Sequence, residues 1–122
     1  RREARVDDGR PIFLQIAELI ENQVIDGSLV EGAQVPSTNE FAAFHRINPA
    51  TALKGITLLV DAGVLYKRRG IGMFVAEGAR ARLLAERRER FAAEYVHPLV
   101  VEARALGLTT DHLIEMIRKG TP

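Results

Sequence analysis

Two helix start signals lie close together near the middle of the chain, at Ser37 and at Asn48. Residues 37–40 form a capping box, in which the serine hydroxyl can accept a hydrogen bond from the N–H of Glu40 and the Glu40 side chain can reach back. Asn48 is a favoured N-cap, and Pro49 at the first helical position gives up no hydrogen bond. Only about three or four residues are left for the turn between the two helices, which is the spacing of a helix-turn-helix.

The second helix is predicted over residues 49–62, with Asn48 as its N-cap and Gly63 as the residue that ends it. Apolar residues on one face follow the helical period, as expected for a buried stripe: Ala52, Ile56, Leu59 and Val60. Short or flexible side chains lie elsewhere on the helix: Ala50, Thr51, Lys54 and Thr57. Such a surface can enter a groove of DNA, and the positive end of the helix dipole faces phosphate.

A basic β-hairpin is predicted directly after this helix. Residues 64–66 and 73–75 are strand-like, and residues 67–72 are expected to form the loop. Three consecutive cations at this loop are compatible with a solvated surface or with a phosphate contact: Lys67, Arg68 and Arg69. Since the hairpin follows two capped helices, we favour contact with phosphate or with the minor groove.

Two short helices followed by a hairpin predict a winged helix-turn-helix within a chain that is mainly α. The motifs resemble, over about residues 10–76, the DNA-binding domain of GntR-family bacterial transcription regulators: Pro11-Ile-Phe-Leu-Gln-Ile-Ala, Gly32-x-x-Val-Pro-Ser, Glu40-Phe-Ala, Asn48-Pro-Ala-Thr, Leu59-x-x-x-Gly63-Val-Leu and Arg69-Gly-Ile-Gly-Met-Phe-Val75. The Asn-Pro start and the short tail resemble the small YtrA-like subfamily. The resemblance implies a dimeric repressor that binds double-stranded DNA.

The chain departs from the family pattern where many members carry arginine: it has Asn39 in the first of the two helices, and Pro49 and Leu53 in the second. Asn39 can instead pair with adenine, and Ala50 or Leu53 can touch a thymine methyl group. The residues expected to bind DNA are Ser37, Thr38, Asn39, Asn48, Pro49, Ala50, Thr51, Leu53, Lys54, Lys67, Arg68, Arg69 and Gly70.

The chain is expected to divide into three parts: a charged and flexible N-terminal arm, residues 1–10; the winged helix-turn-helix domain, residues 11–76; and a C-terminal helical dimerisation arm, residues 77–122. Within the second part, a supporting helix is predicted from Pro11 or Ile12 to Asp26, followed by a loop or short strand beside the hairpin.

The C-terminal part is dense in strong helix formers. Pro98 predicts a kink because it lacks an N–H and clashes with the carbonyl of Glu94, and Thr109 or Thr110 is expected to cap a last helix. Two amphipathic helices cover each other poorly, so a second copy of the chain is the natural cover, with packing on the winged domain as the alternative. The expected dimer interface consists of Leu84, Arg88, Phe91, Tyr95 and Leu99.

Composition favours a small regulator over an enzyme. The net charge is only +1, so a DNA-binding surface has to be a local patch. There is no cysteine, and no glycine-rich phosphate loop, zinc-protease motif or nucleophile elbow. No apolar run is long enough to span a membrane or to act as a signal peptide. We therefore expect a cytoplasmic protein with no metal and no evident cofactor, although a small effector could bind between the arms of a dimer.

Two functions are compatible with these patterns. The first is a sequence-specific DNA-binding regulator that uses residues 48–62 and the basic wing at residues 67–72. The second is a winged-helix module that binds another protein and has no specific DNA site. The basic hairpin and the uncharged surface around Ala50 and Thr51 favour DNA.

Overall fold

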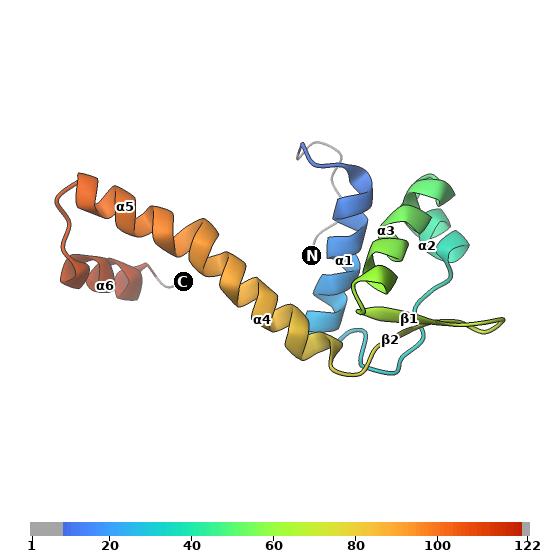
Figure 1. Cartoon of the computed structure of the whole chain (residues 1–122). Helices are drawn as coiled ribbons and strands as arrows, with labels where there is room; N and C mark the ends of the chain where they lie inside the picture. Colours follow the sequence, from blue (N-terminus) through green and yellow to red (C-terminus); the bar gives the residue numbers. More distant parts are fainter. Residues whose placement is uncertain (1–8, 121–122) are drawn as a thin grey trace. The chain divides into compact units, whose positions relative to one another are not determined.

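The computed structural model describes residues 9–120, which are mainly helical with one antiparallel hairpin, as predicted (Figure 1). The elements in order are α1 (Ile12–Asp26), α2 (Thr38–His45), α3 (Pro49–Asp61), β1 (Leu65–Arg68), β2 (Gly72–Val75), α4 (Ala79–Phe91), η1 (Ala92–Val96), α5 (His97–Ala105) and α6 (Thr110–Lys119). The chain divides into two compact units, Arg1–Leu84 and Ala85–Pro122. The expected flexible arm, residues 1–10, lies outside the described residues except for its last two positions.

The core of the first unit lies between α1, α2, α3 and the hairpin. The apolar stripe predicted on α3 lies there, with Ala52, Ile56 and Leu59 buried and Val60 partly buried. On α1 the buried residues are Ile16, Ala17, Ile20 and Val24. Helix α3 contacts α1, α2 and β1, so it is the element that joins the others.

Helices α1 and α3 approach each other closely at Gly55. A Cβ atom at this position would lie 2.6 Å from the carbonyl oxygen of Phe13 and 3.0 Å from Cγ2 of Ile16. Rotating a side chain cannot relieve a clash with a backbone oxygen, so this packing requires glycine. No local pattern in the sequence indicates this role for Gly55.

The turn between α2 and α3 carries the predicted caps. Ser37 Oγ accepts a hydrogen bond from the N–H of Glu40 at 3.1 Å, and Glu40 Oε1 accepts one from the N–H of Ser37 at 2.9 Å. Helix α2 ends at Arg46, whose φ of 57° lies in the left-handed region. Asn48 then caps α3, because its Oδ1 accepts from the N–H of Ala50 at 2.7 Å. The two helices are therefore joined by a short turn, as predicted.

The hairpin differs from the prediction at its tip. β1 extends to Arg68 and β2 begins at Gly72, and these two residues are paired. Lys67 and Arg68 therefore lie in a strand, and of the three consecutive cations only Arg69 lies in the loop. The predicted loop, residues 67–72, is wrong at both ends because backbone pairing continues further than the apolar pattern indicated.

The segment before α2 pairs with the free edge of β2. Gln34 forms an isolated antiparallel bridge with Phe74, and the N–H of Val35 donates to the carbonyl oxygen of Met73 at 2.9 Å. This confirms that the segment lies beside the hairpin as a short extended piece.

The start of α4 belongs to the first unit. Ala79 and Leu83 are buried in its core. Glu31 accepts hydrogen bonds from the N–H of Gly78 at 2.9 Å and of Arg80 at 3.4 Å, so a distant side chain caps this helix. The first unit accordingly continues to Leu84, beyond the boundary expected at residue 76.

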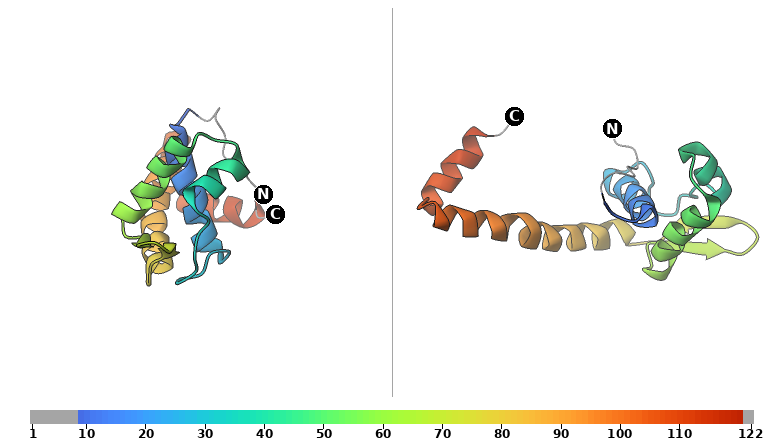
Figure 2. Two further views of the ribbon diagram at one scale, coloured as in Figure 1. Left: turned by 90° about the vertical axis from the view of Figure 1, so that its right-hand side faces the viewer. Right: turned by 90° about the horizontal axis from the view of Figure 1, so that it is seen from above.

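In the second unit, the irregularity predicted at Pro98 takes the form of the π-helical segment η1. The N–H of His97 donates to the carbonyl oxygen of Ala92, five residues earlier. Pro98 has no N–H for the carbonyl of Glu94, and a wider turn at this point accommodates the missing hydrogen bond. After α5 the chain turns back into α6, as Figure 2 shows, and Thr109 is its cap, accepting from the N–H of His112 at 3.1 Å.

We predict that Gly55→Ala lowers the free energy of unfolding by about 1–3 kcal/mol, because the added methyl group would overlap the Phe13 carbonyl. At an unobstructed helical site the same substitution would stabilise the protein by roughly 0.5–1 kcal/mol. Urea denaturation gives both the sign and the size of the change. Thr57→Ala, at an exposed position of the same helix, is the control. A Gly55→Ala protein more stable than wild type would contradict the packing argument.

Candidate nucleic-acid interface

The first turn of α3 presents a small, uncharged surface. Pro49 and Ala50 are exposed, Thr51 is half-buried, and Leu53 remains 48% exposed. No acidic side chain occupies this turn, so no negative charge offsets the positive end of the helix dipole, although the Asn48 side chain caps the N–H groups of Ala50 and Thr51. Such a helix end can come close to a polyanion and can touch base edges without the obstruction of long side chains.

The asparagines at the starts of α2 and α3, Asn39 and Asn48, have different roles. Asn48 is committed to the fold, since its Oδ1 accepts from the N–H groups of Ala50 and Thr51. Asn39 is exposed, and within residues 9–120 its side chain makes no hydrogen bond. It is not needed as a cap, because Ser37 caps α2. Asn39 thus offers an amide oxygen and an NH₂ group to a ligand.

Lys54 faces α1 in this structure. Its Nζ lies 4.1 Å from the centre of the Phe13 ring, which is a cation–π geometry. Of the residues expected to bind DNA, Lys54 is therefore the one whose charge is directed towards the protein's own core helix.

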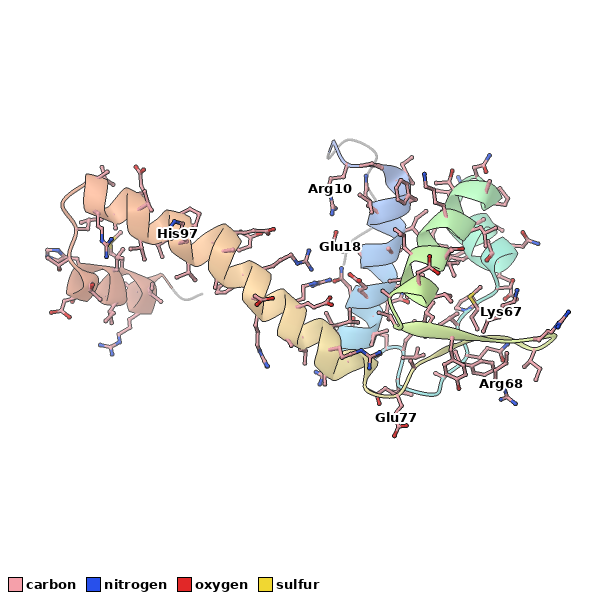
Figure 3. All side chains as sticks on the ribbon, in the orientation of Figure 1. Arg10, Glu18, Lys67, Arg68, Glu77 and His97 are labelled. Atoms are coloured by element: carbon pink, nitrogen blue, oxygen red, sulfur yellow. The ribbon has the colours of Figure 1, made fainter. Side chains whose placement is uncertain are left out.

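The two strand cations of the hairpin point to opposite faces. Alternation along a strand separates Lys67 from Arg68, and Figure 3 shows the two side chains on opposite sides of the hairpin. Arg68 lies on the face of the aromatic pair, with its guanidinium carbon 5.3 Å from the centre of the Phe74 ring. Tyr66 stacks on Phe74 with the ring centres 5.7 Å apart, so this face also carries two aromatic rings. The hairpin thus carries positive charge on both faces.

Two further residues shape this surface, and the sequence patterns did not predict either of them. Arg46 is an exposed cation in the turn between α2 and α3, held by its left-handed backbone. Gln34 supports the hairpin, since its Nε2 donates to the carbonyl oxygen of Ile71 at 3.0 Å. The position of Arg46 in the short turn before the Asn48 cap was an available signal, whereas the contact between Gln34 and Ile71 spans too much sequence to be seen in a local pattern.

Other kinds of site have little support among the described residues. No group of three or more histidine, cysteine, aspartate or glutamate side chains within residues 9–120 could hold a metal ion. An open groove of about 750 Å³ lies beside α2, and two of its polar lining residues are engaged in the fold, Glu40 in the capping box and Gln34 on the hairpin. In the described part of the chain, no helix is long and apolar enough to cross a membrane.

Comparison with known proteins is consistent with this geometry. The model of the bacterial regulatory proteins of the gntR family matches residues 13–75. The chain is 31% identical over 112 residues to the HTH-type transcriptional regulator YhcF of Bacillus subtilis, covering 92% of this chain and 91% of that protein. It is 28% identical to the HTH-type transcriptional repressor YtrA of the same organism, covering 89% of this chain and 83% of that protein.

Solved structures give the same result. A GntR-family transcriptional regulator from Bacteroides thetaiotaomicron is 31% identical with a TM-score of 0.76, covering 88% of this chain and 94% of that chain. The DNA-binding domain of AraR, solved in complex with its operator ORE1, is 31% identical with a TM-score of 0.51, covering 52% of this chain and 78% of that chain. The family and the relatives YhcF and YtrA are transcriptional regulators and not enzymes.

Because Asn48 caps α3 and Asn39 caps no helix, we predict that replacing the two asparagines has different effects on stability. Asn48→Ala should lower the free energy of unfolding by about 1 kcal/mol, because two N–H groups of α3 lose their acceptor. Asn39→Ala should change it by less than about 0.5 kcal/mol. Urea denaturation followed by circular dichroism compares the two variants, and equal losses would show that Asn39 also supports the fold.

Proposed function

Because this chain belongs to the gntR family of bacterial regulatory proteins, in its YtrA-like subfamily, we propose that it is a dimeric repressor that binds a pseudo-palindromic operator. Family membership makes it a transcriptional regulator with a DNA-binding helix-turn-helix domain. The repressor role, the dimer and the form of the operator are the parts that we propose. The similarity to a protein named as a repressor supports the first of these.

The observation that carries the proposal is the pairing of two surfaces within one unit. One is the uncharged, exposed first turn of α3, and the other is the hairpin with cations on both faces and at the loop. A helix in the major groove with a basic hairpin on the adjacent backbone or minor groove would use both. The similarity to a DNA-binding domain solved on its operator supports this assignment.

We divide the other residues expected to bind DNA into those that position the protein on the phosphate backbone and those that recognise bases. Ser37 and Thr38 at the start of α2, Thr51 and Gly70 are assigned to the phosphate backbone. Asn39 is assigned to adenine, whose N6 and N7 match an amide, and Ala50 and Leu53 are assigned to thymine methyl groups. This readout would differ from that of family members with arginine at the positions of Asn39, Pro49 and Leu53. Lys54 would have to leave the Phe13 ring to reach phosphate.

The dimer is proposed from the apolar face of the second unit. Phe91, Tyr95 and Leu99 are 57%, 64% and 43% exposed, and the rings of Phe91 and Tyr95 contact each other at 5.6 Å. Helix α6 exposes further large apolar side chains: Ile114, Met116 and Ile117. A monomer rarely leaves so much apolar surface uncovered, and a two-fold related copy would cover it. Leu84 and Arg88, on the preceding turns of α4, would complete the interface.

A cytoplasmic location is proposed because a bacterial repressor has to bind the chromosome.

The interaction of the winged domain with another protein is the second candidate function. It is favoured by the exposed apolar surface of the same unit at Phe44, which is 81% exposed. An effector between the arms of the dimer would be a further component, without a polar cluster that identifies its chemistry.

The contribution of the wing can be tested through the salt dependence of DNA binding. Replacing Arg68 and Arg69 by alanine should weaken binding to all duplexes and reduce the slope of log K against log salt by about 0.9 for each lost phosphate contact. Fluorescence anisotropy at several salt concentrations measures this slope. The matched control removes two exposed arginines from the second unit, Arg104 and Arg118, and should leave the slope unchanged. If wild type binds no duplex at all, the protein-interaction alternative is favoured.

The dimer can be tested by adding charge to the proposed interface. Phe91→Glu combined with Tyr95→Glu should give a monomer at micromolar concentration, because two charges would have to be buried. Ala93→Glu, which adds one charge roughly on the opposite side of the helix, should leave the dimer intact. Analytical ultracentrifugation distinguishes these states, and a wild-type protein found only as a monomer would refute the interface.

A further inference from the structure

The tip of the hairpin is a tight turn that carries one large apolar side chain. The N–H of Ile71 donates to the carbonyl oxygen of Arg68 at 2.9 Å, which closes a turn over residues 68–71. Gly70 has a φ of 77° while Arg69 does not have a positive φ, and this combination is a type II turn. Ile71 is the residue that completes the turn, and it is 55% exposed.

Ile71 is held in place although its side chain is free. Its N–H is used within the turn, and its carbonyl oxygen accepts from Gln34 Nε2 at 3.0 Å. A Cβ atom on the next residue, Gly72, would overlap the same Gln34 nitrogen, so Gly72 permits this support. Both polar backbone groups of Ile71 are therefore satisfied within the protein, and an aliphatic surface is what this residue offers to a partner.

The charges around the tip define how the hairpin can enter DNA. Lys67 and Arg68 lie on opposite faces, and Arg69 lies in the loop. A hairpin placed edge-on in the minor groove, which is about 6 Å wide, would direct one cation to each phosphate wall and its tip to the floor. At that floor, A·T pairs present only acceptors, whereas G·C pairs add the N2 amino donor of guanine.

From these observations we infer that Ile71 is a specificity-determining residue that selects A·T over G·C pairs in the minor groove beneath the wing. An aliphatic group cannot accept a hydrogen bond, so it would bury the guanine amino group without a partner. Over an A·T pair it covers no donor. The inference rests on the proposed function, since it assumes that the chain binds a specific operator.

The experiment uses inosine, which lacks the N2 amino group but has the same major-groove edge as guanine. An operator is first obtained by binding-site selection with the full chain. Each A·T pair is then replaced in turn by G·C and by I·C, and the affinities are compared. Beneath the wing, I·C should bind like A·T, and G·C should bind roughly tenfold more weakly. Where the major groove is read, I·C should instead behave like G·C.

Variants of the chain assign the effect to Ile71. At that position, Ile71→Ala should reduce the logarithm of the ratio of I·C affinity to G·C affinity to less than about half of its wild-type value. Ile71→Asn should reduce this ratio further, because its side chain provides an acceptor for the guanine amino group. The control is Val30→Ala, which trims another exposed aliphatic residue of the same unit and should preserve the wild-type discrimination. Circular dichroism confirms that each variant is folded.

Three outcomes would overturn the inference. In the first, the operator contains no position at which I·C behaves like A·T. In the second, the discrimination between G·C and I·C persists unchanged in Ile71→Ala. In both cases the chain still binds its operator, so the proposed function stands. If the selection yields no operator at all, the proposed function fails and the inference fails with it.

Discussion

The close contact between α1 and α3 is the interaction on which the rest of the first unit depends. Helix α3 contacts α1, α2 and β1, so its position constrains the positions of these three elements. That position is set in turn by Gly55, where any larger residue would meet the carbonyl oxygen of Phe13. The same contact keeps Lys54 over the Phe13 ring. A backbone contact between two helices thus determines which side of α3 remains available to a ligand.

Polar side chains in the helix-turn-helix are divided between holding the fold and facing solvent. Ser37, Glu40 and Asn48 satisfy N–H groups at the starts of two helices, and a cap of this kind is worth about 1 kcal/mol. Asn39 is not required for capping and is exposed. Because neighbouring side chains satisfy the backbone, the amide of Asn39 is not needed to hold the start of α2.

The wing depends on contacts that are distant in the sequence. Gln34 donates to the carbonyl of Ile71 and pairs with Phe74, and Val35 continues this pairing on the free edge of β2. A two-stranded hairpin is marginally stable alone, so a third extended segment on its edge has a large effect on its order. Glu31, close to this segment, also caps the start of α4. One loop therefore supports both the wing and the beginning of the C-terminal helix.

The sequence by itself determined the elements whose signals are local. The caps at Ser37 and Asn48, the buried stripe of α3 and the cap at Thr109 were predictable because each depends on residues within a few positions of one another. Only the tertiary structure decided the role of Gly55, the extension of β1 through Arg68 and the capping of α4 by Glu31. These features depend on atoms brought together by the packing of distant segments, and no local pattern encodes such distances.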